Sequence, residues 1–283
     1  MNIFTGNISK GFRYIPQDNY LFCNPKTAGL DYLYSDSATS CIILIVVGRD
    51  CNGNPLVGLT HLSRKERYEA FFKLAEEKFK GGVAVYAQGA NPPFPVKKGD
   101  SYSYDGIQNS EIIFKWIADK VYYPQEEKET PSFFIEQCTV AVGSGDPNVG
   151  FGGYGINVDI ESTDYLQVSN KYFHLPIGVR DPENGVQTLF CIFGTPRVDD
   201  NKSRLVLHNV NESFTDEEKE ILVSRANERN WENLLELSED EILNKYSTTP
   251  EFEPAWFVSN LIESAEFVRN YNHNTEGKEL CVL

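Results

Sequence analysis

The chain has 283 residues, of which 41 are Asp or Glu and 26 are Lys or Arg, so its formal net charge is −15. A surface this acidic repels nucleic-acid phosphates and anionic lipid heads, so we expect no nucleic-acid partner and no membrane insertion. Hydrophobic residues make up 41% of the chain, enough for a packed core, which argues against intrinsic disorder. The longest apolar run, Cys41 to Val47, is too short to span a bilayer.

The six cysteines and four histidines form no recognisable metal or disulfide pattern. No two cysteines make a C-x-x-C pair, and the histidines are scattered, so we expect no metal site. The amino terminus lacks the basic and apolar regions of a signal peptide. We therefore expect a soluble protein with free thiols in a reducing compartment such as the cytoplasm.

The clearest predicted element is a strand over 41–47, apolar at every position and therefore typical of a strand buried on both faces. Segment 48–55, rich in turn residues, follows this strand. The pattern of residues 56–62 is typical of a strand, which would be the return strand of a hairpin. A central hairpin is the first element that the sequence indicates.

Helix and strand signals continue beyond the hairpin. Ser63 and Glu66 predict a capping box that opens a helix over 63–79. Further predicted elements are a strand at 83–87, a helix near 110–121, strands at 133–142 and 155–160, strand-like runs at 188–193 and 204–207, and helices that start near 215, 238 and 253. We predict an α+β fold with a division near 168: a domain over 1–168 and a mixed or helical extension over 169–283.

The hairpin can bring a cysteine and a histidine together. If its loop is 49–53, Cys41 faces His61, and facing residues have Cβ atoms ~4.5–5.5 Å apart. A tight turn at Asn52-Gly53 would instead set His61 opposite Leu44. A thiol beside an imidazole can ionise and act as a nucleophile. On spacing alone, two ordinary packing residues are the favoured interpretation.

The segment from Ser35 to Leu62 resembles the catalytic hairpin of CheD, the chemoreceptor glutamine deamidase, and of the cytotoxic necrotizing factor toxins. In that superfamily a hydroxyl residue lies six positions before the nucleophilic Cys, small residues precede the Cys, an apolar strand follows it, and a His closes the return strand. The matching residues here are Ser35, Thr39, Ser40, Cys41 and His61. The order of predicted elements over 33–162 also matches, although Ser40 stands where the family usually has glycine.

The resemblance implies a layered β-sandwich with flanking helices and cysteine-dependent deamidation of a protein glutamine, without metal or organic cofactor. Cys41 would be the nucleophile, His61 the base and Ser35 the residue that orients it. The backbone N–H groups of Ser40 and Cys41 would hold the oxyanion. Further candidates for the substrate cleft are Thr39, Gln88 and Asn91.

The implied partner is a protein that carries the target glutamine, such as a small GTPase or another host protein. Resemblance to toxins further implies a bacterial toxin or secreted effector that a specialised secretion system delivers into a host cytosol. Two alternatives stay open. The same dyad serves transglutaminases and cysteine proteases, and a non-enzymatic acidic binding protein could carry the Cys and His by coincidence.

Overall fold

The computed structural model describes residues 12–24, 27–30, 32–123, 129–143, 153–157, 168–169, 177–194, 205–254 and 256–279. The chain divides into two compact units. Unit 1 comprises Met1–His174 and Leu207–Asn211, and unit 2 comprises Leu175–Val206 and Glu212–Leu283. Sequence reasoning placed one division near 168 and did not anticipate the return of 207–211 to unit 1.

Unit 1 is built on a mixed six-stranded sheet. Its strand order is β12-β2-β5-β4-β6-β9, in which β12 with β2 and β6 with β9 are parallel and the other neighbours antiparallel. The strands are β2 (Asn19–Cys23), β4 (Ile42–Arg49), β5 (Pro55–Leu62), β6 (Lys80–Gly89), β9 (Phe133–Val142) and β12 (His208–Asn209). The expected α+β class is therefore present.

The central strand β4 faces two separate apolar layers, as its sequence predicts. Ile42, Leu44 and Val46 point into a core that includes the apolar faces of the unit 1 helices. Ile43 and Ile45, on the alternate face, point into a second core with residues of the smaller sheet. Because side chains alternate along a strand, a run without polar residues is stable only where both faces are covered.

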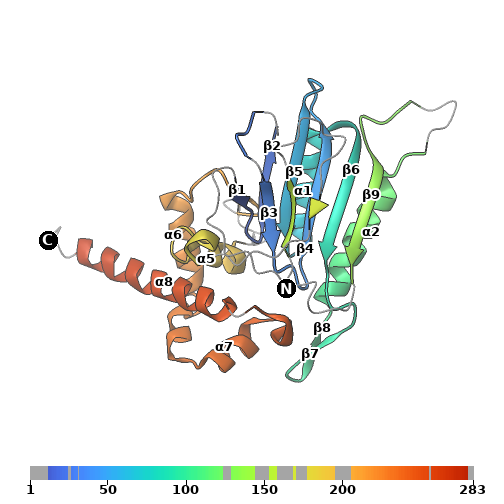
Figure 1. The fold of residues 1–283 in the computed structure, drawn as a ribbon. Coiled ribbons are helices and arrows are strands. Elements are labelled where there is room, and N and C mark those ends of the chain that lie inside the picture. The colour runs from blue at the N-terminus through green and yellow to red at the C-terminus, as the bar shows by residue number, and fades with distance from the viewer. Residues whose placement is uncertain are drawn as a thin grey trace. The chain divides into compact units, whose positions relative to one another are not determined.

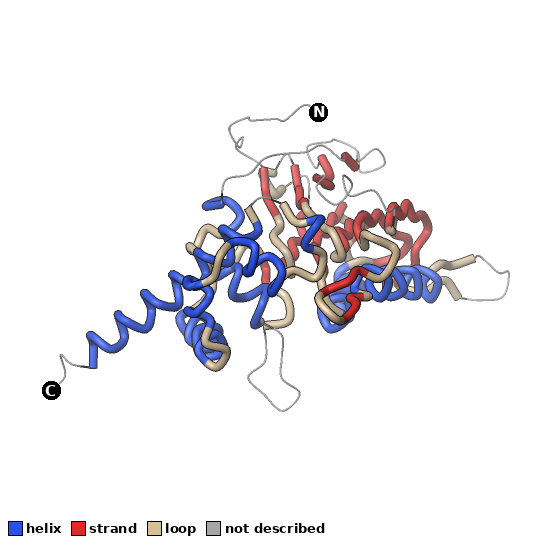
Figure 2. Tube along the Cα trace, turned by 90° about the horizontal axis from the view of Figure 1, so that it is seen from below, coloured by secondary structure: helices blue, strands red, loops and turns tan. Residues whose placement is uncertain are grey.

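A four-stranded sheet covers one face of the larger sheet and two helices cover the other (Figure 1). Seen from below, the strands of unit 1 stack above its helices (Figure 2). The smaller sheet has the order β1-β3-β10-β11, and Leu33 of β3 lies in the core that the two sheets share. Its strands are β1 (Phe12–Tyr14), β3 (Tyr32–Asp36), β10 (Gly153–Asn157) and β11 (Val168–Ser169).

The covering helices are α1 (Lys65–Lys78) and α2 (Asp105–Lys120), close to their predicted positions. The predicted capping box is wrong, because Arg64 is the N-cap residue and makes no side-chain capping bond. The Ser63 hydroxyl donates to Asp18 instead. Between β6 and α2, a two-stranded arm is formed by β7 (Val96–Lys98) and β8 (Ser101–Ser103).

Unit 2 is largely helical among its described residues. Thr215 and Ser238 form the capping boxes of α6 (Asp216–Asn227) and α7 (Glu239–Tyr246), and α8 (Phe257–Glu279) is the longest helix. The other described elements are α4 (Ile177–Arg180), α5 (Val186–Phe193), and the 3₁₀ helices η2 (Trp231–Glu236) and η3 (Pro250–Phe252).

Two strand predictions in this region are wrong. Residues 188–193 belong to helix α5, whose Val186, Leu189 and Phe190 fall at helical spacing in the unit 2 core. The Asp181 carboxylate accepts the backbone N–H groups of Gln187 and Thr188 and so caps the first turn of this helix. A short apolar run is ambiguous between strand and helix, and this cap lies upstream of the run. Residues 205–207 form a turn, and the strand follows at β12.

Candidate active site

The hairpin register differs from the one that would set Cys41 directly opposite His61. The loop is 50–54, and β4 and β5 pair so that Ile43 faces His61. The Asp50 carboxylate accepts the backbone N–H groups of two loop residues, at 2.8 Å each, which stabilises the turn at this position. Neither of the two registers considered from the sequence is therefore the one observed.

The shift nevertheless keeps Cys41 and His61 on the same face of the sheet. Cys41 precedes Ile43 by two positions, and the side chains of alternate residues share a face. Cys41 also lies in the core cluster that contains Ile43. The cysteine is therefore a diagonal neighbour of His61, a relation that corresponds to ~7–8 Å between backbones and somewhat less between Cβ atoms. Only a shift by an odd number of residues would have separated them.

The ring of His61 is oriented by Ser35, which reaches it from the smaller sheet. The Ser35 hydroxyl donates to the carbonyl of Ile15 at 2.7 Å and lies 3.0 Å from Nδ1 of His61. A hydroxyl has one proton, so the oxygen of Ser35 must accept the Nδ1–H of His61. This assigns the neutral imidazole as the Nδ1–H tautomer, with Nε2 as its basic nitrogen. Ser35 and His61, both candidates from the sequence, are therefore in contact.

Cys41 and His61 are nearly buried, with 8% and 3% of their surfaces exposed. Cys41 is one of the free thiols among the described cysteines. Burial raises the pKa of Tyr68 well above its ordinary range, and the ionisable thiol of Cys41 raises it further. The thiol therefore lies within electrostatic range of the Tyr68 hydroxyl, which donates to the carbonyl of Leu62 at 3.1 Å.

The backbone around Cys41 is held by the end of β6. Ala90 donates its N–H to the carbonyl of Cys41 at 2.7 Å, and Asn91 donates its N–H to the carbonyl of Thr39 at 2.6 Å. Gly89 adopts a φ of +129°, and a Cβ placed there would lie 2.2 Å from the carbonyl oxygen of Cys41. Only glycine permits this approach, so the end of β6 fixes the position of the cysteine.

Asn109, on α2, ties the cysteine segment to the histidine strand. Its side-chain amide donates to the carbonyl of Ser40 at 2.7 Å and to the carbonyl of Ser63 at 3.3 Å. Ser40 precedes the cysteine by one residue, and Ser63 follows His61 by two. One buried amide thus bridges both halves of the candidate site.

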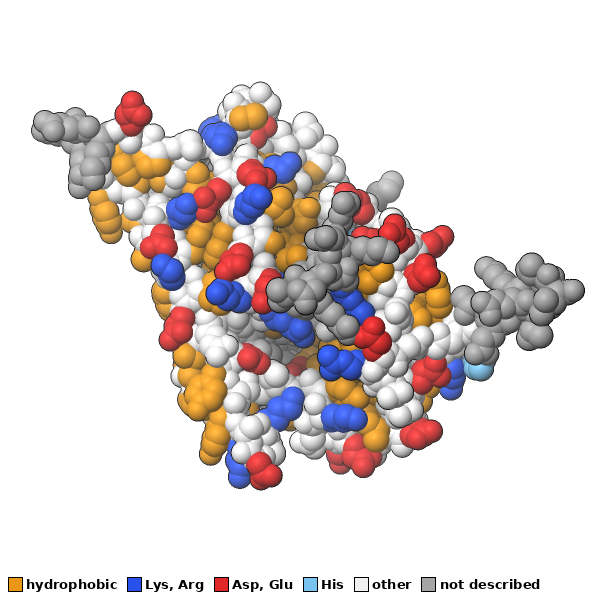
Figure 3. Space-filling view, turned by 180° about the vertical axis from the view of Figure 1, so that it is seen from behind, with side chains coloured by type: hydrophobic (Ala, Val, Ile, Leu, Met, Phe, Trp, Pro, Cys, Tyr) orange, Lys and Arg blue, Asp and Glu red, His pale blue; other side chains and the backbone are white. Residues whose placement is uncertain are grey.

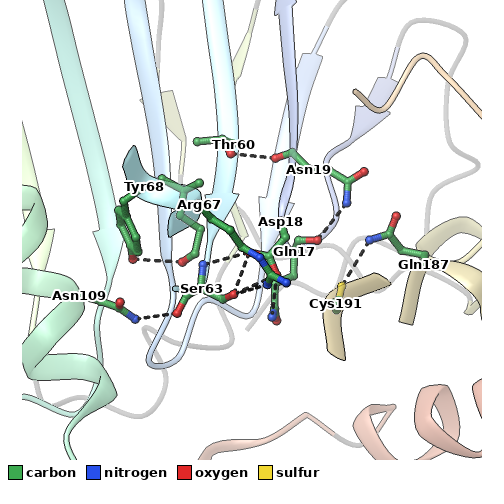
Figure 4. Close-up of polar contacts among 11 residues, drawn as sticks. Gln17, Asp18, Asn19, Thr60, Ser63, Arg67, Tyr68, Asn109, Gln187 and Cys191 are labelled. Carbon is green, nitrogen blue, oxygen red and sulfur yellow. Dashed lines mark hydrogen bonds and ion pairs between the residues drawn. The ribbon is translucent and has the colours of Figure 1, made fainter. Parts of the chain in front are cut away.

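A buried ion pair supports the same strand end (Figure 4). Arg67 of α1 pairs with the carboxylate of Asp18, and both side chains are fully buried. Ser63 donates its backbone N–H and its hydroxyl to Asp18 at 3.1 and 2.8 Å. The backbone N–H of Asp18 donates to the carbonyl of His61 at 2.6 Å. The ion pair therefore holds the main chain of His61 in place.

The remaining residues predicted from the sequence lie around the same point. Thr39, Ser40, Gln88 and Asn91 are all buried. In the described part of the chain, the backbone N–H of Ser40 donates to no other backbone group, which leaves it suited to an oxyanion. Gln88 pairs with Ile43 on the side of β4 opposite to His61, so it shares their face of the sheet.

Asn109, Arg67 and Asp18 were not identified from the sequence. Arg67 and Asn109 could have been found from the sequence, because each is a polar residue on an otherwise apolar face of a predicted helix. Arg67 lies four positions before Phe71, and Asn109 four before Ile113, both buried. Asp18 had no such signal, since its partners come from distant segments.

No protein-family model matches the chain, and no curated protein matches it significantly. Within the described ranges, no three His, Cys, Asp or Glu side chains gather so as to hold a metal ion. No helix in those ranges combines the length and apolarity needed to cross a membrane. On the face in Figure 3, basic side chains are interspersed among acidic ones. The geometry of Ser35, Cys41 and His61 therefore carries the functional argument.

Proposed function

We propose that the protein is a cysteine-dependent glutamine deamidase of the CheD and cytotoxic necrotizing factor type, with Cys41 as nucleophile and His61 as base. The observation that carries the proposal is the hydrogen bond from His61 Nδ1–H to Ser35, on a histidine that shares a sheet face with Cys41. A general base needs one ring nitrogen kept basic, and the bond from Nδ1–H to Ser35 leaves Nε2 in that state. The stacking of two sheets with helices on one side supports the likeness in fold.

The proposed reaction consumes water and releases ammonia. The Cys41 thiolate attacks the carbonyl carbon of the glutamine side chain, and the π electrons of that bond move to the oxygen. The C–N bond then breaks as His61, protonated at Nε2, gives its proton to the departing nitrogen. Water attacks the resulting thioester and gives a proton to His61, and the C–S bond breaks to yield glutamate and the thiolate. No other reactant is required.

The burial of the pair favours a side-chain amide over a main-chain peptide bond as the substrate. Proteolysis requires an extended backbone with a bulky residue on either side of the scissile bond. With 8% of Cys41 and 3% of His61 exposed, only a slender side chain reaches the thiol without rearrangement. Glutamine is slender and carries its carboxamide at the end of a flexible stem.

The arm formed by β7 and β8 supports a protein as the carrier of that glutamine. Phe94, Tyr102 and Tyr104, on or beside the arm, are each about half exposed (53%, 57% and 49%). The arm follows the segment that bonds to Thr39 and precedes the helix that bonds to Ser40. Aromatic residues are enriched at protein–protein interfaces, so an arm that exposes three of them suits contact with a protein substrate.

The decisive test is thiol chemistry that needs no known substrate. We expect iodoacetamide to alkylate Cys41 at neutral pH faster than the exposed Cys51 in the same molecule, because pairing with an imidazole favours the reactive thiolate of Cys41. His61→Ala should remove that advantage. Equal reactivity of Cys41 in wild type and His61→Ala would contradict the pair and favour a non-enzymatic binding protein.

Activity tests then separate deamidation from the related reactions. Cys41→Ser should abolish ammonia release from glutamine-containing proteins while leaving the circular-dichroism spectrum unchanged. His61→Ala should lower the rate by ~10²–10⁴-fold, the usual effect of losing a general base. A transglutaminase would instead incorporate an added primary amine, and a protease would cleave the chain, both visible by intact mass.

A further inference from the structure

Gln88 and His61 lie on opposite sides of β4, each paired with the same residue of that strand. Ile43 pairs with His61 on β5 and with Gln88 on β6, so the three side chains form one row on one face of the sheet. Cys41 immediately precedes β4 and lies two residues before Ile43. It is therefore a diagonal neighbour of Gln88 as well as of His61, at the same ~7–8 Å backbone separation.

The surroundings of Gln88 distinguish it from an ordinary strand glutamine. Its exposure is 6%, and its row partner Ile43 lies in an apolar core cluster. A carboxamide in such a layer must make hydrogen bonds that offset its loss of water. Elsewhere on that face, Ile45 of β4 lies in the cluster and Tyr86 of β6 packs against it, so Gln88 is a buried amide beside an apolar layer.

We propose that Gln88 is a catalytic residue that donates from its side-chain amide to the oxygen of the substrate carboxamide. This inference rests on the proposed deamidase function and adds a residue to it. As the Cys41–carbon bond forms, the π electrons of the carbonyl move onto oxygen. The neutral side-chain amide of Gln88 and the backbone N–H of Ser40 then both donate to the oxyanion. His61, on the other side of β4, transfers the proton to the leaving nitrogen. The same donor would stabilise the oxyanion formed from any acyl group that reaches Cys41, the substrate carboxamide included.

Two reagents separate this role from a structural one. Acylation of Cys41 by p-nitrophenyl acetate passes through an oxyanion, whereas alkylation by iodoacetamide displaces iodide at carbon and forms none. We would measure both rates at Cys41 by intact mass and peptide mapping. The variants are Gln88→Met, which keeps the length of the side chain without a donor, and Gln88→Glu, which keeps its shape.

We expect both variants to slow acylation of Cys41 by at least tenfold, towards the ~10²–10³-fold typical of losing an oxyanion donor, and to leave alkylation within about twofold. Gln137→Met is the matched control, because Gln137 is an exposed glutamine on the neighbouring strand β9 and should change neither rate. Parallel losses of both reactions, or no loss of acylation, would overturn the assignment of Gln88. If wild-type Cys41 reacts no faster than Cys51 with either reagent, the deamidase proposal itself fails, and the role of Gln88 fails with it.

Discussion

At the scale of single residues, the Ser35 hydroxyl determines which nitrogen of His61 carries the proton. The hydroxyl donates its one proton to the carbonyl of Ile15, so its oxygen accepts a hydrogen bond from the Nδ1–H of the ring. The side chains come from two different sheets, so the bond also fixes the ring relative to the strand that bears Cys41. The chemistry proposed for the site depends on this contact.

Removing that hydroxyl should reduce the reactivity of the cysteine. In Ser35→Ala the Nδ1–H loses its acceptor, and a lost buried hydrogen bond costs about 1–3 kcal/mol. We expect alkylation of Cys41 at neutral pH to slow by about tenfold. Ser35→Thr keeps a hydroxyl and should restore most of the rate. If Ser35→Ala and Ser35→Thr are equally reactive, the hydroxyl does not orient His61.

A second residue, Cys23, gives a pH dependence to stability. Burial raises the pKa of its thiol from 9.0 to about 11. The folded state therefore keeps the thiol neutral while the unfolded chain ionises from about pH 9, so its contribution to stability is complete below that pH and is lost as the pH rises to about 11. The loss approaches about 1.4 kcal/mol per pH unit in that window.

Urea unfolding at pH 8 and pH 10 tests this expectation. The free energy of unfolding of the wild type should fall more between the two pH values than that of Cys23→Ala, which has no thiol to ionise. The raised pKa of Tyr68 adds a similar loss at still higher pH in both proteins, so the comparison ends at pH 10. An equal fall in both would show that Cys23 does not carry the effect.

At the scale of elements, the end of β6 acts as the support of the nucleophile segment. Gly89 and Ala90 lie against the carbonyl of Cys41, and the next residue bonds to Thr39. These contacts join strands that are distant in the sequence, so the cysteine is positioned by β6 as well as by its own hairpin. A change in this support should therefore alter reactivity as well as stability.

Gly89→Ala and Gly53→Ala form a matched pair that isolates this support. Both glycines have positive φ, +129° and +77°, so both substitutions strain the backbone by a similar ~1–3 kcal/mol. A Cβ at Gly89 would also lie 2.2 Å from the carbonyl oxygen of Cys41, whereas at Gly53 it would meet nothing within 4 Å. We expect Gly89→Ala to lower both thermal stability and Cys41 alkylation, and Gly53→Ala to lower stability alone. Identical behaviour of the two variants would contradict a positioning role for Gly89.

At the scale of the whole molecule, the two units have separate apolar cores. The two core clusters of unit 1 share no residue with that of unit 2, in which Leu222 and Trp231 are buried. Apolar burial is the main source of stability, so units with separate cores can open separately. We therefore expect a substitution in the core of one unit to destabilise that unit more than the other.

Leu222→Ala should therefore act mainly on unit 2. Leu222 is fully buried in α6, and such truncations cost about 2–5 kcal/mol. Hydrogen exchange should accelerate in α5, α6 and α8 by more than in β4, β5 and β6. Ile45→Ala, in the central strand of unit 1, should give the opposite pattern. Uniform acceleration across both units in either variant would mean that the chain unfolds as one cooperative body.

The sequence by itself determined the features that depend on local pattern. The apolar run after Cys41 specified a strand with two covered faces, and Thr215 and Ser238 marked two helix starts, because strand burial and helix caps involve residues close in sequence. Only the tertiary structure decided the register that sets Ile43 opposite His61, the helix at 186–193, the contacts of Asn109, and the position of Gln88 opposite Ile43. The loop considered from the sequence, 49–53, and the observed loop, 50–54, have the same length, so Cys41 and His61 stay on one face although the loop's position changes which residues pair. Contacts between residues dozens of positions apart exist only once the sheets and helices have packed, and the candidate site consists mostly of such contacts.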